Sequence, residues 1–271
     1  MFTKDGYTTR LYSGQLPSKA LTRIDKVDVV SPGLMFVQLA GKLDIHQAII
    51  LGTLLCSCPN GPRSEPLVTS KELQTFLDSM NKYYGLPNAR TAIKYVNDRA
   101  CSIMEVFVAL FLSLPNHLGG LGLKGGYFNY KVELDPRGSA ALGQGVCYID
   151  YCFPDAKIAC EYLGDEHKNT VDNDSVRNMA LARMGYRVVT VTKSQLYHPE
   201  KLDQFLQQLA EMHGTKIRIR SKKYETAHRR ICELLPRMSY PIDTIDAINQ
   251  PQSSNFPSKK IVMSGRAQKP L

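Results

Sequence analysis

The chain has 271 residues and a formal net charge of +9, and its composition is that of a globular protein long enough for one large domain or two small ones. No apolar run approaches the roughly 20 residues that a membrane-spanning helix needs, and the first residues lack the apolar core of a secretory signal. Its seven cysteines are therefore expected to be reduced, buried thiols, which is typical of a cytoplasmic protein without a membrane partner.

Residues 1–100 are expected to form a small helical region. The segment VDVV at 27–30 predicts a short strand, and Ser31-Pro32 predicts a helix with proline in its first turn. Thr69-Ser70-Lys71-Glu72 is a capping-box sequence, which predicts the start of another helix. Two further helices are expected at 44–55 and 88–96. Their periodicity indicates packing only, and we assign no chemistry to this region.

Residues 101–213 are expected to form an α/β domain. An almost wholly apolar helix begins at Ser102 and should be buried. After it, β-branched and aromatic residues predict strands, and helical periodicity predicts helices. The strands are expected at 126–134, 147–153, 156–164 and 186–192, and helices are expected at 175–184 and 199–213. The glycine-rich segment 135–145 is expected to be a hairpin loop between the first two strands.

Two carboxylates, Asp150 and Glu161, lie in or at the end of strands that are otherwise apolar. Burying an unpaired carboxylate costs several kcal/mol, and two acids on adjacent strands repel each other unless a cation lies between them. Mg²⁺ binds one or two carboxylates and keeps its waters, which suits a phosphate substrate. We therefore expect a site for Mg²⁺ or Mn²⁺. The alternatives are an Asp150 that accepts N–H groups near a hairpin end and a Glu161 on the exposed face of its strand.

A longer set of residues carries a resemblance to a known family. The set consists of Glu105, Asp150, the run Glu161-Tyr162-Leu163-Gly164-Asp165-Glu166-His167, Asp174-x-x-Arg177-x-x-x-Leu181 and Gly185-Tyr186-Arg187-Val188. In this order it resembles the PD-(D/E)XK nuclease superfamily, and within it the very-short-patch-repair endonuclease-like group. The resemblance covers about residues 100–213. It implies a restriction-endonuclease-like αβββαβ core, a mixed sheet flanked by helices, and metal-dependent hydrolysis of phosphodiester bonds in DNA.

The resemblance also implies roles for individual residues. Asp150 and Glu161 would bind the metal, with Glu105 as a third ligand, although Ser102-x-x-Glu105 is equally a capping box. His167 would be a general acid or base, since imidazole titrates near neutrality, or it is a surface histidine. Arg177 would pair with an acid of the site or with phosphate, or it forms a plain salt bridge.

One position departs from the family pattern. Leu163 stands two residues after Glu161, where the superfamily has an Asp or Lys and where its lysine positions or activates the attacking water. Lys157, Lys168 or His167 would have to replace it. The alternative function is therefore a non-catalytic nucleic-acid-binding or regulatory protein with a degenerate nuclease fold, of the toxin–antitoxin or phage-defence type in bacterial defence.

Residues 214–271 are expected to be a basic C-terminal extension. They hold 12 Lys and Arg against 4 Asp and Glu, so they carry most of the net charge. Such a block predicts an anionic partner, DNA first and RNA as a second possibility, and the alternatives are a solvated tail or one that docks on an acidic protein. The residues expected to contact phosphates are Arg177, Lys193, Lys216, Arg218, Arg220, Lys222 and Lys223. Residues 237–271 have little periodicity and are expected to be extended.

Overall fold

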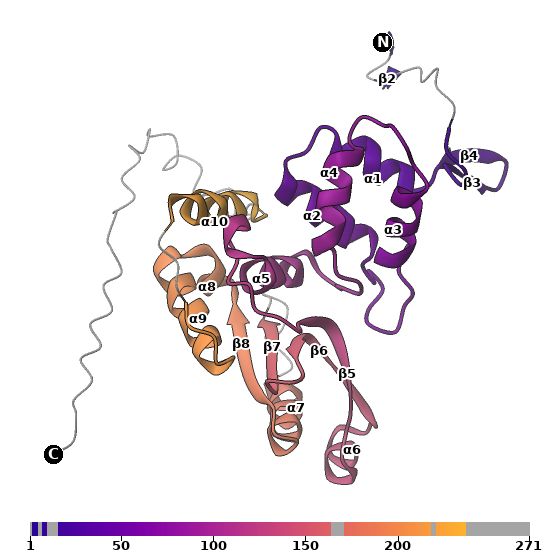
Figure 1. Ribbon diagram of the computed structural model, residues 1–271. Helices are drawn as coiled ribbons and strands as arrows, with labels where there is room; N and C mark the ends of the chain where they lie inside the picture. The colour runs from indigo at the N-terminus through magenta and orange to yellow at the C-terminus, as the bar shows by residue number, and fades with distance from the viewer. Residues whose placement is uncertain (1, 5–6, 10–15, 164–170, 218–220, 237–271) are drawn as a thin grey trace, which may run out of the picture. The chain divides into compact units, whose positions relative to one another are not determined.

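The structure, a computed structural model, describes residues 2–4, 7–9, 16–163, 171–217 and 221–236 (Figure 1). The chain divides into two units, Met1–Leu235 and Pro236–Leu271, and the first contains every element described below. Among the described residues, no helix combines the length and the apolar character that crossing a membrane requires. The predicted tail at 237–271 lies outside the described residues.

The N-terminal third contains two β-hairpins followed by short helices. Its elements are β1 (Phe2–Lys4), β2 (Tyr7–Thr9), β3 (Leu21–Ile24), β4 (Val27–Val30), α1 (Pro32–Ala40), α2 (Ile45–Leu55), α3 (Ser70–Asp78), α4 (Leu86–Ala92) and the 3₁₀ turn η1 (Ile93–Tyr95). Ser31, Asp44 and Thr69 cap α1, α2 and α3 with their side chains, so the helix starts predicted there are confirmed. The strand at 27–30 is also confirmed. Its partner β3 was not expected.

A four-stranded mixed sheet flanked by helices forms the rest. The strands are β5 (Tyr127–Glu133), β6 (Val146–Phe153), β7 (Ile158–Leu163) and β8 (Arg187–Thr192), in that order across the sheet. The first two neighbouring pairs are antiparallel and β7–β8 is parallel. The helices are α5 (Ile103–Ser113), the 3₁₀ turn η2 (Asn116–Leu118), α6 (Pro136–Leu142), α7 (Val171–Arg183), α8 (Lys193–Tyr197), α9 (Pro199–Met212) and α10 (Lys222–Leu234). The mixed α/β class is confirmed.

The sheet separates two hydrophobic clusters. On one side, Tyr151, Phe153 and Ile158 join a large cluster that includes α5 and α9. On the other side, Cys152 and Ala159 pack with residues that include Leu181 of α7 and Tyr186. Burial of these apolar side chains is the main force that holds the layers together.

The segment 135–145 is not the loop that we expected. It contains α6, which begins where Asp135 accepts the N–H of Gly138 at 2.7 Å and Pro136 occupies the first turn. An Asp-Pro pair is a favourable helix start, and Gly143 ends the helix at φ +65°. The glycine content of the segment was therefore misleading, because Gly143 ends a helix, after which the chain enters β6.

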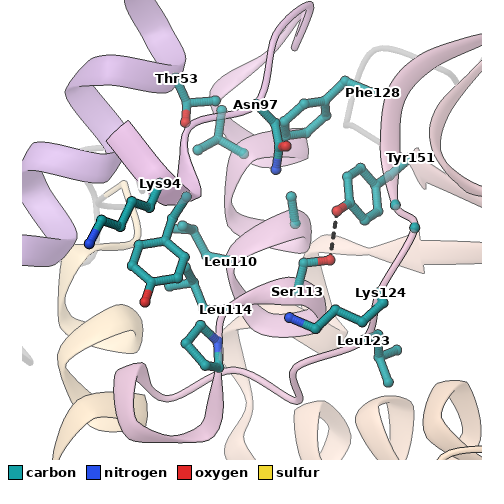
Figure 2. Close-up of a pocket in the computed structure, with 16 residues that line it drawn as sticks. Thr53, Lys94, Asn97, Leu110, Ser113, Leu114, Leu123, Lys124, Phe128 and Tyr151 are labelled. Carbon is teal, nitrogen blue, oxygen red and sulfur yellow. Dashed lines mark hydrogen bonds between the residues drawn. The ribbon is translucent and has the colours of Figure 1, made fainter. Parts of the chain in front are cut away.

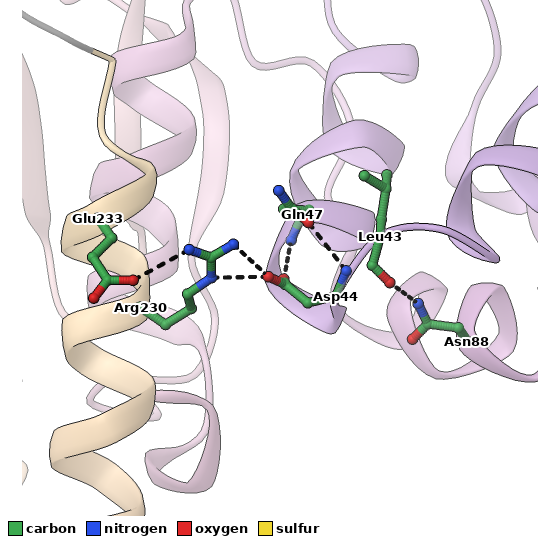
Figure 3. A network of polar contacts seen from close by, with 6 residues as sticks. All are labelled: Leu43, Asp44, Gln47, Asn88, Arg230 and Glu233. Carbon is green, nitrogen blue, oxygen red and sulfur yellow. Dashed lines mark hydrogen bonds and ion pairs between the residues drawn. The ribbon is translucent and has the colours of Figure 1, made fainter.

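The basic C-terminal segment contributes a packed helix, α10. Ile231 is fully buried, and the His228 ring lies 2.8 Å from the carbonyl oxygen of Gly119 and stacks on Tyr224. Arg230 binds Asp44 Oδ2 through Nε at 2.8 Å and Nη2 at 2.7 Å (Figure 3). This interaction joins α10 to the start of α2. It is half-exposed, so water screens it and we expect its contribution to stability to be small.

The close approach of η2 to α10 leads to a stability prediction for Gly119→Ala. Gly119 has φ +87°, and an added Cβ would lie 2.6 Å from the carbonyl carbon of Ala227. Left-handed strain costs about 1 kcal/mol, and overpacking against backbone adds about 1–3 kcal/mol. Chemical denaturation should show a loss of about 2–4 kcal/mol in the free energy of unfolding. Gly185→Ala is the matched control, because Gly185 has φ +85° and open space around it, and equal losses in the two variants would contradict the prediction.

Candidate functional site

Asp150 and Glu161 lie on adjacent antiparallel strands at the point where their ladder ends. The last paired residues are Tyr151 and Cys160, and the same register continued by one residue places Asp150 opposite Glu161. Both acids are half-buried. Asp150 Oδ2 accepts the backbone N–H of Tyr162 at 2.8 Å. The strands thus bring the two predicted metal ligands to one end of the β6–β7 hairpin.

Glu105 joins them from the first turn of α5. Ser102 caps this helix by accepting the N–H of Glu105, as the sequence predicts. The Glu105 carboxylate does not accept the backbone N–H of Ser102, however, which a complete capping box requires. Its Oε2 accepts the N–H of Cys101 instead, at 2.9 Å. The same oxygen accepts the side-chain amide of Asn129 at 2.8 Å. Glu105 is therefore a buried acid that is held toward the sheet.

Asn129 is a residue of this site that the sequence reasoning missed. It is buried, it has φ +44°, and its amide also donates to the carbonyl oxygen of Arg99 at 2.9 Å. The pairs on either side of it in the β5–β6 register place it opposite Asp150. The available signal was an asparagine between the aromatic residues of a predicted strand. Asparagine adopts a positive φ more readily than most residues, and this is the conformation that Asn129 has.

The three carboxylates influence one another through Asp150. Burial raises the pKa of Glu161 to about 8, and the charge of Asp150 adds to this shift while Arg177 opposes it. Burial also raises the pKa of Glu105 to about 7, again with a contribution from Asp150, against the hydrogen bonds that Glu105 accepts. The acids from α5, β6 and β7 are thus close enough to form one electrostatic group.

Arg177 of α7 is the cation of this group. Its Nη2 donates to Glu161 Oε1 at 2.8 Å and also contacts the carbonyl oxygen of Tyr148. The side chains of Arg177 and Glu161 are 26% and 12% exposed, so the ion pair is largely shielded from water. Arg177 therefore forms a salt bridge to Glu161, which agrees both with a role in the site and with a plain structural salt bridge.

A cavity of about 380 Å³ lies beside the acids, lined by residues that include Glu105, Asp150 and Arg177. Within the described residues, which omit 164–170, no group of three or more His, Cys, Asp or Glu side chains is arranged to hold a metal ion. The carboxylate oxygens nevertheless suit Mg²⁺, which needs few protein ligands and keeps its waters. A cation bound there would compete with Arg177 for Glu161.

The structure does not bring the other predicted residues to this cavity. Lys193 begins α8, Lys216 is exposed, Lys222 and Lys223 are exposed in the first turn of α10, and none of the four lines the cavity. His167, Lys168, Arg218 and Arg220 lie outside the described residues. Leu163 is 41% exposed at the end of β7. Lys157 lies 4.3 Å from the centre of the Tyr186 ring, in the turn at the opposite end of β7.

Comparison of the chain with protein-family models, with curated proteins and with solved structures gave no match.

Proposed function

We propose that the chain is a metal-dependent endonuclease that hydrolyses phosphodiester bonds in DNA in the cytoplasm, on a core of restriction-endonuclease type. The observation that carries the proposal is that Glu105 and Glu161 are buried next to Asp150: burial, and with it the charge of Asp150, raises the pKa of both. Glu105 and Asp150 line a cavity, and Glu161 lies on the strand beside Asp150, so acids from three elements are gathered near it. Perturbed carboxylates in a cavity are typical of catalytic sites.

In the proposed reaction, Asp150 and Glu161 would hold Mg²⁺ or Mn²⁺, with Glu105 as a third ligand. The ion would act as a Lewis acid and lower the pKa of a bound water. Burial and Asp150 raise the pKa of Glu105 to about 7, and a cation bound beside it would oppose this shift and favour the carboxylate that a ligand must be. Arg177, once a cation neutralises Glu161, can turn to a substrate phosphate, which guanidinium groups bind well. His167 keeps its proposed role as a general acid or base.

A non-catalytic nucleic-acid-binding or regulatory protein is the second candidate function. Two observations favour it: Leu163 offers no charged group, and Arg177 already neutralises Glu161 at 2.8 Å. In this case α10 and the preceding basic residues would supply the affinity for phosphates, and the acids and Arg177 would be a structural ion-pair network.

An assay on supercoiled plasmid separates the two functions. The protein is incubated with Mg²⁺, with Mn²⁺ or with EDTA, and nicked and linear products are measured, while binding to the same DNA and to RNA is measured at rising salt. Cleavage in either metal that EDTA stops supports the nuclease. Salt-sensitive binding without cleavage supports the binding module. Absence of both contradicts both proposals and favours docking of the basic segment on an acidic protein.

A further inference from the structure

A second cavity, of about 210 Å³, lies along another face of α5 (Figure 2). One wall is formed by α5 residues that include Leu110 and Ser113. The opposite walls come from the end of the N-terminal helices and from the loop that leads into β5. None of the acids discussed above lines this cavity, so its chemistry is independent of theirs.

Two lysines, Lys94 and Lys124, give this cavity a positive rim. Both are exposed, and among the described residues neither forms an ion pair. In the part of the chain that the structure describes, no acidic side chain lines the cavity. Two cations without a local counter-charge favour an anionic ligand, and a phosphate group is the ligand that lysine ammonium groups commonly bind.

Lys124 is presented by a backbone that is held in place. The N–H of Leu123 donates to the carbonyl oxygen of Leu112 at 2.9 Å, and the carbonyl oxygen of Lys124 lies 3.1 Å from the His213 ring. Gly126 lies against Tyr151, since an added Cβ would be 2.6 Å from Tyr151 Cζ. A fixed backbone reduces the ordering that a ligand must impose, which favours binding.

The interior of the cavity combines apolar and polar surfaces. Phe128 and Leu110 are apolar, while Asn97 and Thr53 place an amide and a hydroxyl on the same wall (Figure 2). Ser113 and Tyr151 satisfy each other with a hydrogen bond of 2.6 Å between their hydroxyls. An amide both donates and accepts hydrogen bonds, as the edge of a nucleobase requires. The volume suits a base with part of its sugar, while the phosphate would remain at the rim.

We propose that this cavity binds a 5′-mononucleotide, with its phosphate on Lys94 and Lys124 and its base beside Asn97. The site goes beyond the proposed nuclease function, because it requires neither the metal nor the acids. The nucleotide has two possible sources with the same chemistry: a free 5′-mononucleotide, or the terminal nucleotide of a 5′-phosphorylated DNA strand.

Calorimetric titration of the full chain tests this proposal with thymidine 5′-monophosphate, thymidine and inorganic phosphate as probes. The monophosphate should bind at least about tenfold more tightly than either part alone, because both halves of the site are engaged. The double variant Lys94→Ala/Lys124→Ala should weaken this binding by about tenfold or more. Lys26→Ala/Lys71→Ala is the control, since it removes the same charge at exposed lysines outside the cavity.

A second variant tests the base-binding half. Asn97→Leu should weaken the binding of the monophosphate by about tenfold and leave the affinity for inorganic phosphate unchanged. A tetranucleotide with a 5′-phosphate distinguishes the two sources, with the same strand carrying a 5′-hydroxyl as its control. Tighter binding of the phosphorylated strand than of the free monophosphate assigns the site to strand ends. Tighter binding of the free monophosphate assigns it to free nucleotide. Equal affinity for all three probes, or equal losses in the two lysine double variants, would overturn the proposal.

Discussion

If the proposed function holds, replacing Asp150 by Asn should reduce plasmid cleavage by about a thousandfold or more, because a metal ion would contribute several kcal/mol of transition-state stabilisation and this change would remove a charged ligand. The fold should persist. Asparagine has nearly the same shape, and its side-chain oxygen can still accept the N–H of Tyr162 that Asp150 accepts at 2.8 Å. Asp155→Asn in the β6–β7 turn is the control, since it removes an exposed carboxylate at the other end of the hairpin.

The same variant should become more stable at alkaline pH. Glu105 and Glu161 have pKa values raised from 4.5 to about 7 and about 8, so burying them costs more as the pH rises through this window. Removing the charge of Asp150 lowers both pKa values and therefore reduces that cost, by on the order of 1 kcal/mol near pH 8. Urea denaturation at about pH 5 and about pH 8 measures the difference. Retained cleavage would contradict the proposed role of Asp150, and lower stability at pH 8 would contradict the electrostatic argument.

Replacing Arg177 by Met should destabilise the protein by about 3 kcal/mol at about pH 9. Breaking a buried ion pair costs about 3–5 kcal/mol, and the 26% exposure of Arg177 places the loss at the lower end. The loss should be smaller at about pH 5, where the proton on Glu161 is present in the folded state of both proteins. Without Arg177 the pKa of Glu161 rises further. The pH range over which the variant loses stability therefore reaches to a higher pH than in the unchanged protein.

Arg183→Met provides a control on the same helix. Arg183 pairs with Asp135, but both side chains are well exposed, at 41% and 37%, so we expect a much smaller loss of stability than for Arg177→Met. If the proposed function holds, Arg177→Met should also bind Mn²⁺ more tightly, because the ion no longer competes with the guanidinium for Glu161. Similar stability losses in the two variants would show that the Arg177 pair is screened like a surface pair.

Much of the fold could be predicted because its signals are local. The β-branched and aromatic residues of β6, β7 and β8 predict strands. Helix starts are predicted by capping side chains, those of Ser31, Asp44, Thr69 and Ser102. α6 also carried a local signal in Asp135-Pro136, which the surrounding glycines obscured. The placement of Asp150 near Glu161 followed from two acids in consecutive strands.

The parts that escaped prediction depend on contacts between distant residues. Asn129 reaches Glu105 across 24 positions of sequence, and Arg230 reaches Asp44 across 186. A pattern in a single segment can mark one of these residues, but it does not encode which distant residue is its partner. The cavity bordered by Lys94 and Lys124 was missed for the same reason, since its walls meet only when α5, η1 and the loop before β5 are assembled.

The docking of α10 has a consequence for biosynthesis. Ile231 of α10 is completely buried, and α10 contacts α2, α5 and η2. Arg230 also binds Asp44 at the start of α2, so a helix of the N-terminal third completes its contacts only with a helix near the end of the chain (Figure 3). A ribosome releases the chain from its N-terminus onward, so the contacts of α2 with α10 must wait for most of the polypeptide to emerge. The final closure of this fold is therefore a post-translational event, and nascent chains that stop before residue 222 would leave apolar surface available to chaperones.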